Sequence, residues 1–198
     1  FPIVAWSGNN ETVWGIEAVM LAAGTNIEWL VEDMGIIASP AESHDLAASV
    51  ETTDGVIYVP ALLGLGTPHW DFGARGTLLG LTRGSTKAHI TRAVLEGVAN
   101  RGADLVEAAE EDTGLTLATL RIDGGMSVNP TFVQALANAT GRTVETATEA
   151  DSTTLGAAYL AGVATGIWPD LSTAASETSP RSIVDPNAEV DRDKWKDA

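Results

Sequence analysis

Hydrophobic positions at the start of the chain alternate in a way that predicts two short strands. Residues 1–7 and 12–17 are rich in β-branched and aromatic side chains, and the Gly-Asn-Asn sequence at residues 8–10 between them is typical of a hairpin turn. After Ala18 the apolar residues recur every three or four positions. This period predicts an amphipathic helix that ends at Gly35.

The rest of the chain alternates helical and strand patterns, and capping residues mark the ends of its main helices. A polar residue with a free side-chain oxygen precedes each of these helices, and two of them end at a glycine. The predicted elements are, in order, a short helical patch at 45–50, a buried strand at 55–62, a long helix at 86–109 capped by Ser85 or Thr86 and stopping at Gly114, a strand at 117–122, a helix from Asn129 and Pro130 to Gly141, a strand at 143–147 and a helix at 152–164. This order predicts an α/β domain with a mixed sheet flanked by helices.

Two segments lack a regular period. Residues 64–84 hold six glycines and a proline, which predicts irregular backbone. From Ser172 onward the chain is polar and acidic, and we expect an extended tail with a short helix around residues 191–196. The sequence is therefore divided into a domain at 1–170 and a tail at 171–198.

Charge and composition exclude several classes of function. The 198 residues carry a net charge of −16, and residues 1–74 contain ten acidic residues and no lysine or arginine. Nucleic acid would be repelled, and a polyphosphate near the first third of the chain would have to be held by backbone amides. No apolar stretch is long enough for a membrane helix, and the absence of cysteine excludes disulfides and agrees with a cytoplasmic location. The first residue is Phe1 rather than methionine, which suggests a fragment or a processed chain.

Familiar catalytic motifs are missing. The sequence contains no lysine-bearing phosphate loop, no complete dinucleotide fingerprint and no zinc-binding helix motif. The histidines His44, His69 and His89 are scattered, so we expect structural or surface roles for them and no metal site. Arg75 and Arg83 are expected to tie the glycine-rich hairpin to carboxylates such as Asp71.

Two glycine-bearing segments carry the most information. At residues 120–134 a predicted strand delivers Gly124 and Gly125 and then a helix, so a ligand could approach backbone amides where no Cβ stands in the way. The same pattern equally fits an ordinary tight connection that needs glycine for its dihedral angles. The helix at 151–166 has small residues along one side, which favours close packing.

Four motifs together resemble a known family. They are VPALLGLGTPHWDFGARGTLLGLTRG at 59–84, HITRAVLE at 89–96, RIDGGMSVN at 121–129 and TLGAAYLAGVATGIW at 154–168. In this order they resemble the C-terminal domain of the FGGY carbohydrate kinases, and within that family they are most similar to the glycerol kinases.

The resemblance implies an actin-like ATPase (ribonuclease H-like) fold in which two lobes close over ATP and a sugar alcohol. The chain corresponds to the second lobe, without the first strand of that lobe and its phosphate turn. The N-terminal lobe of the same enzyme is then an expected partner that holds the polyol and the general-base aspartate, so no catalytic residue is assigned here. The open sheet edge predicts association of copies into a homo-oligomer.

The resemblance also implies ATP and Mg²⁺ as cofactors and a set of nucleotide-binding positions. These are Gly24, Glu28, Gly124, Gly125, Met126 and Asn129. Glu28 departs from the family, because glycerol kinases usually have glutamine at this position, and the change brings an anionic group toward an anionic ligand. Asn129 fits either a helix cap or a group that hydrogen-bonds to the nucleotide.

The implied reaction is phosphorylation of glycerol to glycerol 3-phosphate once the two lobes are joined. Two alternatives stay open: a kinase for another substrate, such as xylulose, gluconate or erythritol, and a non-catalytic actin-like module that binds adenine nucleotide. The expected partners are a small polyol or sugar, with no role for nucleic acid or a membrane.

Overall fold

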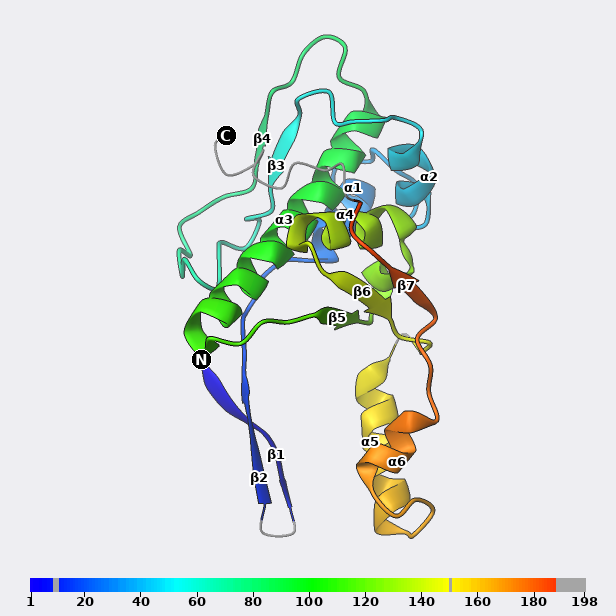
Figure 1. Cartoon of the computed structure of the whole chain (residues 1–198). Coiled ribbons are helices and arrows are strands. Elements are labelled where there is room, and N and C mark those ends of the chain that lie inside the picture. The colour runs from blue at the N-terminus through cyan, green and yellow to red at the C-terminus, as the bar shows by residue number, and fades with distance from the viewer. Residues whose placement is uncertain (9–10, 150, 188–198) are drawn as a thin grey trace. The chain divides into compact units, whose positions relative to one another are not determined.

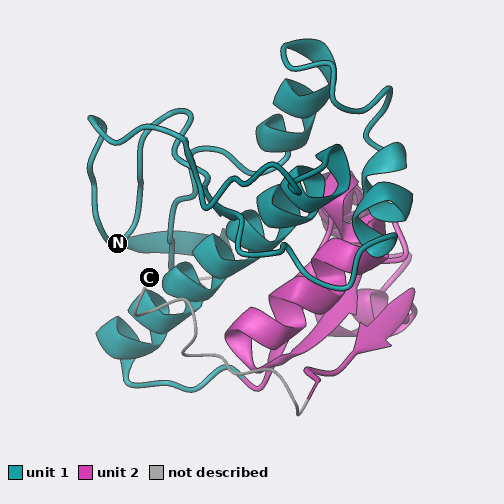
Figure 2. Ribbon diagram, turned by 90° about the horizontal axis from the view of Figure 1, so that it is seen from above, with its two compact units in different colours: residues 1–117 teal, residues 118–198 magenta. Residues whose placement is uncertain are grey.

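The computed structural model describes residues 1–8, 11–149 and 151–187. The chain forms two compact units, residues 1–117 (unit 1) and residues 118–198 (unit 2), which are coloured separately in Figure 2. Among the described residues no helix has both the length and the apolar character that a membrane span requires. The predicted division at residue 170 stays a prediction.

Unit 1 begins with an antiparallel hairpin (Figure 1). Strand β1 (Pro2–Gly8) pairs with β2 (Glu11–Ile16), with an irregular register between Val4 and Trp6. Both strands were predicted from the apolar pattern and are confirmed. The two turn residues lie outside the described part of the chain.

Helix α1 spans Thr25–Glu32 and is shorter than predicted. The expected start at Ala18 is wrong because the backbone before α1 bonds to a distant loop instead of forming helical hydrogen bonds. Val19 donates its N–H to the Thr67 hydroxyl at 3.0 Å, and the N–H of Thr67 donates back to the Val19 carbonyl at 3.0 Å. Gly66 permits this approach, since a Cβ there would lie 2.2 Å from the Val19 carbonyl oxygen.

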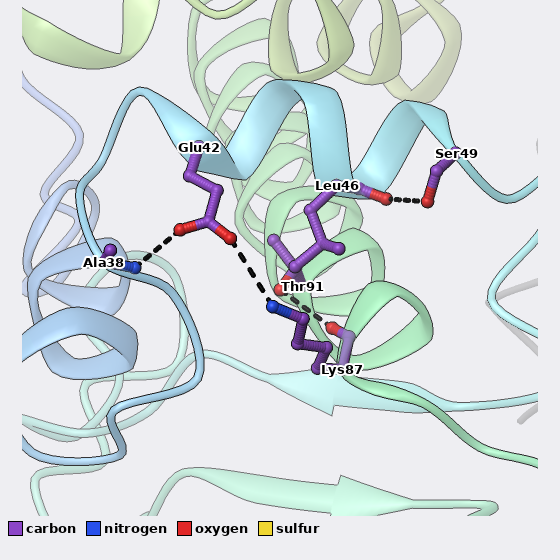
Figure 3. Close-up of polar contacts among 6 residues, drawn as sticks. All are labelled: Ala38, Glu42, Leu46, Ser49, Lys87 and Thr91. Atoms are coloured by element: carbon purple, nitrogen blue, oxygen red, sulfur yellow. Dashed lines mark hydrogen bonds and ion pairs between the residues drawn. The ribbon is translucent and has the colours of Figure 1, made fainter.

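Helix α2 (Glu42–Ala48) lies against the long helix α3 (Lys87–Thr113). Figure 3 shows that Glu42 accepts the Ala38 N–H at 2.7 Å and pairs with the Lys87 ammonium at 3.5 Å. The Ala38 N–H, with a smaller effect from Lys87, lowers the pKa of Glu42 below its ordinary value. This carboxylate therefore links the start of α2 to the start of α3.

Helix α3 has the ends that its sequence predicted. Thr86 and His89 form a reciprocal capping box in which the Thr86 N–H donates to His89 Nδ1 at 3.1 Å. Gly114 ends the helix in the left-handed conformation at φ +67°. His89 is thus a structural residue, as expected.

Two short strands complete unit 1. Strand β3 (Ile57–Val59) pairs antiparallel with β4 (Thr77–Leu79), which the glycine-rich sequence did not predict. Strand β3 lies directly on α3 (Figure 1), and only glycine fits at Gly97, since a Cβ there would come within 2.4 Å of the Tyr58 carbonyl oxygen. The core beneath is apolar, with Leu30, Val56, Val94, Leu95 and Val98 essentially excluded from solvent.

The glycine-rich loop is fixed mainly by its own backbone. Asp71 accepts the N–H groups of Gly73 and Ala74 at 2.8 and 3.1 Å. Arg75 donates to the carbonyls of Phe72 and Ala74 at 3.0 and 2.7 Å. The expected pairing of Arg75 with Asp71 is therefore wrong, because the guanidinium group bonds to backbone carbonyls of the loop instead.

Unit 2 contains a mixed three-stranded sheet. Strand β5 (Thr119–Ile122) runs parallel to β6 (Thr143–Thr146), which pairs antiparallel with β7 (Ser182–Val184). The α4 helix (Pro130–Thr140) connects the two parallel strands, and its buried face packs on the sheet. A mixed sheet is therefore present as predicted, but the strands predicted at 1–7, 12–17 and 55–62 pair in two separate two-stranded sheets and not in this one.

The last part of unit 2 is more ordered than the expected extended tail. Helix α5 (Ser152–Ala164) is followed by α6 (Leu171–Ser176), and β7 then joins the sheet. A Cβ on Gly162 would lie 2.3 Å from the Trp168 ring, so this glycine of α5 has a packing role. The helix predicted at residues 191–196 lies outside the described residues.

Candidate functional site

The turn after β5 contains a backbone conformation that only glycine adopts readily. Gly124 has φ +80° and ψ −178°, and Gly125 then opens the short 3-10 helix η1 (Gly125–Val128). We call residues 122–129 the diglycine corner. The sequence Asp-Gly-Gly therefore produces a sharp change of direction at the carboxyl end of a parallel strand.

Two polar side chains hold the diglycine corner from within. The Ser127 hydroxyl is buried and donates to the Gly124 carbonyl at 2.8 Å. Asn129 caps α4, its Oδ1 accepting the Phe132 N–H at 3.1 Å. Of the two roles expected for Asn129, the helix cap is thus observed.

The surface of the diglycine corner leaves room for a ligand. A Cβ built on Gly124 or Gly125 would meet no heavy atom within 4 Å, and Gly125 is exposed. Met126 is half-buried beside them. Bare backbone at a strand-to-helix turn is a surface that a ligand can approach closely.

The neighbouring helix start is already occupied by carboxylates. Asp123 accepts the Ser152 N–H at 3.1 Å, and Asp151 caps α5 by accepting the N–H and the hydroxyl of Thr154 at 2.9 and 2.7 Å. These two bonds from Thr154 lower the pKa of Asp151, the hydroxyl contributing most. The N-terminus of α5 is consequently satisfied by the protein's own anions, and Asp123 braces the diglycine corner against it.

The other two predicted residues lie at the start of α1 in unit 1. Gly24 is the N-cap, has no side chain to cap the helix, and accepts the N–H groups of Ile27 and Glu28 at 2.9 and 3.2 Å. A Cβ on Gly24 would meet no heavy atom within 4 Å, and the Glu28 side chain is exposed one turn away. We call residues 22–28 the Gly24 corner.

The structure thus groups the six predicted residues into two sets. Gly24 and Glu28 belong to unit 1, while Gly124, Gly125, Met126 and Asn129 belong to unit 2. Their roles as nucleotide ligands stay predictions. In the described parts of the chain, no group of three or more histidine, aspartate or glutamate side chains is arranged to hold a metal ion.

Sequence reasoning did not single out the polar pair beneath the Gly24 corner. Asn26 is fully buried and accepts the Tyr58 hydroxyl at 2.7 Å. Burial raises the pKa of Tyr58 to about 12. The signal was present in the sequence, because a tyrosine in a strand that reads as buried needs a partner for its hydroxyl.

Comparison with known proteins shows consistent similarity. Residues 4–165 match the model of the FGGY family of carbohydrate kinases, C-terminal domain. Glycerol kinase of Rhodopirellula baltica is 46% identical over 168 residues, covering 85% of this chain and 31% of that protein. Glycerol kinase of Deinococcus radiodurans is 42% identical over 200 residues, covering 98% of this chain and 40% of that protein. The chain therefore spans about a third to two fifths of the length of these relatives.

Solved structures agree with this pattern. The crystal structure of Plasmodium falciparum glycerol kinase with ADP superposes with a TM-score of 0.86 at 32% identity, covering 99% of this chain and 39% of that one. Xylulose kinase of Lactobacillus acidophilus gives a TM-score of 0.68 at 30% identity, covering 83% and 34% of the two chains. Together these similarities confirm the predicted actin-like α/β fold.

Proposed function

The chain belongs to the FGGY family of carbohydrate kinases, and we propose that it is the nucleotide-binding lobe of an ATP-dependent kinase that phosphorylates glycerol to glycerol 3-phosphate. One observation carries the proposal. The diglycine corner is open backbone at the end of a parallel strand, in a chain that superposes along 99% of its length on a glycerol kinase crystallised with ADP.

In this proposal each corner is a separate candidate contact for nucleotide. Gly125 lets the nucleotide approach the backbone, while the amide of Asn129 adds polar contact at the start of α4. Met126 packs on the adenine ring or fills space beside it. Gly24 and Glu28 border the nucleotide from α1.

The remaining parts of the reaction come from outside these residues. When bound, ATP would supply the phosphoryl group and Mg²⁺ would neutralise part of its charge. In this proposal Mg²⁺ would arrive with the nucleotide phosphates. The N-terminal lobe of the same enzyme would hold glycerol and the general base, in a cytoplasmic enzyme.

Exposed apolar residues on the hairpin support a further covering segment. Val4, Val13 and Trp14 of β1 and β2 are 51%, 51% and 68% exposed. Such a surface is usually covered by protein. We assign this cover to the N-terminal lobe. Association of two copies of the chain through the hairpin is the alternative, which a monomeric complete gene product in light scattering would exclude.

Activity measurements test the proposed reaction. The complete gene product should release ADP from ATP when glycerol is added, and the 198-residue chain alone should be nearly inert because positioning supplies most of the rate in phosphoryl transfer. Xylulose, gluconate and erythritol serve as competing substrates. Faster turnover of one of these compounds than of glycerol would make that compound the proposed substrate instead. ADP production by the 198-residue chain alone would refute the two-lobe mechanism.

Calorimetry with ADP tests the diglycine corner directly. Asn129→Ala should weaken ADP binding by about tenfold if its amide contacts the nucleotide, equivalent to about 1.4 kcal/mol. Asp170→Ala is a matched control, because Asp170 caps α6 in the same unit by accepting the Thr173 N–H at 2.7 Å. Equal ADP affinities of the two variants would remove Asn129 from the site.

A further inference from the structure

A buried amide lies directly beneath the Gly24 corner. The side-chain nitrogen of Asn26 donates to the carbonyls of Ala22 and Ala23 at 3.0 and 2.9 Å. Its oxygen accepts the hydroxyl of Tyr58 at 2.7 Å. Asn26 and Tyr58 are 0% and 4% exposed, so water does not replace these bonds.

Tyr58 itself is held from two sides. Its ring stacks on Trp29 of α1 with ring centroids 6.1 Å apart and an interplanar angle of 14°. Its backbone lies against Gly97 of α3, where a side chain would not fit. The hydroxyl therefore reaches Asn26 from a fixed position in the core of unit 1.

These bonds hold the backbone that leads into the first turn of α1. Ala22 and Ala23 immediately precede Gly24, which has no side chain of its own to cap the helix. The Gly24 carbonyl in turn accepts the N–H of Glu28 at 3.2 Å. A shift of the Asn26 amide would thus move both residues that border the proposed nucleotide.

We propose that Asn26 and Tyr58 are positioning residues that set the nucleotide affinity of the Gly24 corner. The inference rests on the proposed function, because it needs Gly24 and Glu28 at the nucleotide. Neither side chain touches the ligand. Both act through the backbone of residues 22–24, and the effect should appear in nucleotide binding and leave the sugar-alcohol site unchanged.

The two tyrosines of the chain offer a matched test in the complete gene product. Tyr58→Phe removes one buried oxygen and keeps the ring. Tyr159→Phe removes an exposed hydroxyl that lies 3.4 Å from Thr178 in unit 2, again beside a tryptophan ring. We expect Tyr58→Phe to raise the KM for ATP about fivefold with kcat and the KM for glycerol within about twofold of wild type, and Tyr159→Phe to change none of them.

Asn26→Ser is a second variant that keeps a small polar side chain but loses the bridge between the two carbonyls and Tyr58. It should raise the KM for ATP at least as much as Tyr58→Phe does. Kinetics are measured at a temperature where circular dichroism shows every variant folded. If one of the two variants, Tyr58→Phe or Asn26→Ser, does not fold, the KM for ATP of the other variant decides the test.

The outcomes separate this inference from the proposed function. Normal wild-type kinetics with an unchanged KM for ATP in the Tyr58 and Asn26 variants overturn the inference alone. A parallel rise in the KM values for ATP and glycerol also overturns it, because that pattern indicates general loosening. A wild-type gene product that neither binds ADP nor consumes ATP overturns the proposed function, and the inference with it.

Discussion

The two glycine corners are supported in opposite ways. The Gly24 corner rests on buried side chains, with Asn26 and Tyr58 bonded to each other beneath it. The diglycine corner has the buried Ser127 hydroxyl within it, but Asp123, which links the corner to the start of α5, lies at the surface. Water can replace a lost surface hydrogen bond but not a buried one, so removal of a side-chain hydrogen bond should cost more unfolding free energy when the bond is buried.

Substitution of the two bracing side chains gives the largest expected difference. Asn26→Ala removes the partner of the Tyr58 hydroxyl and the amide bonds to Ala22 and Ala23, which should cost about 4 kcal/mol of unfolding free energy. Asp123→Ala should cost less than about 1 kcal/mol, because water can bond to the Ser152 N–H. Urea denaturation of the 198-residue chain measures both, and equal losses would contradict the comparison.

Alkaline pH should weaken the Gly24 corner. The pKa of Tyr58 is raised to about 12 by burial, against an ordinary value of 10.0 that the unfolded chain keeps. Above pH 10 the unfolded state therefore loses this proton first and is favoured, and stability falls by about 2 kcal/mol between pH 10 and 12. The contribution is fully present below pH 10.

The difference in stability between wild type and Tyr58→Phe isolates this titration from that of other groups. A constant difference from pH 9 to 12 would show that the hydroxyl is not kept protonated by the fold. The start of α5, against which Asp123 braces the diglycine corner, should respond at the acidic end of the pH scale. Because hydrogen bonds lower the pKa of Asp151, its capping contribution is present above the ordinary value near 3.8 and is lost as pH falls further.

Backbone strain should make the stability of the protein sensitive to substitution of Gly124, although substitution of Asp123 in the same corner has little effect. Gly124→Ala places a Cβ at φ +80° and ψ −178°, which should cost about 2 kcal/mol although no atom lies within 4 Å. Gly125→Ala is the matched control, with the same open surroundings and no positive φ, and should change stability by less than about 0.5 kcal/mol. Thermal denaturation of the two variants measures this difference. Equal losses of stability in the two variants would mean that the positive φ of Gly124 does not set the cost of the substitution.

Elements with local end signals were predictable from the sequence. Helix α4 begins at Asn129 and Pro130 and ends before Gly141, as the capping pattern indicated, and α3 likewise ends at Gly114. The diglycine corner could be recognised for the same reason, since its strand, glycines and cap are consecutive. What such a corner binds does not follow from its backbone alone, so its nucleotide role stays a prediction.

Features that depend on distant partners were not predictable. Strands β4 and β7 have three residues each, too few for an alternating pattern, and they exist because β3 and β6 pair with them. The start of α1 depends on Thr67, and Asn26 finds its partner 32 residues away in Tyr58. Local periodicity carries no information about pairs this far apart.

The smallest expected effect concerns the exposed charge of the Gly24 corner. Glu28→Gln removes a negative charge and provides the amide that the resemblance to glycerol kinases leads one to expect at this position. If Glu28 borders the nucleotide, the substitution should tighten ADP binding about two- to threefold at low salt, less as salt screens the charge. Glu32→Gln on the same helix is an exposed control one turn farther along. Calorimetry with ADP measures both variants. If they gain the same affinity, the effect comes from net charge alone, and Glu28 is removed from the proposed site.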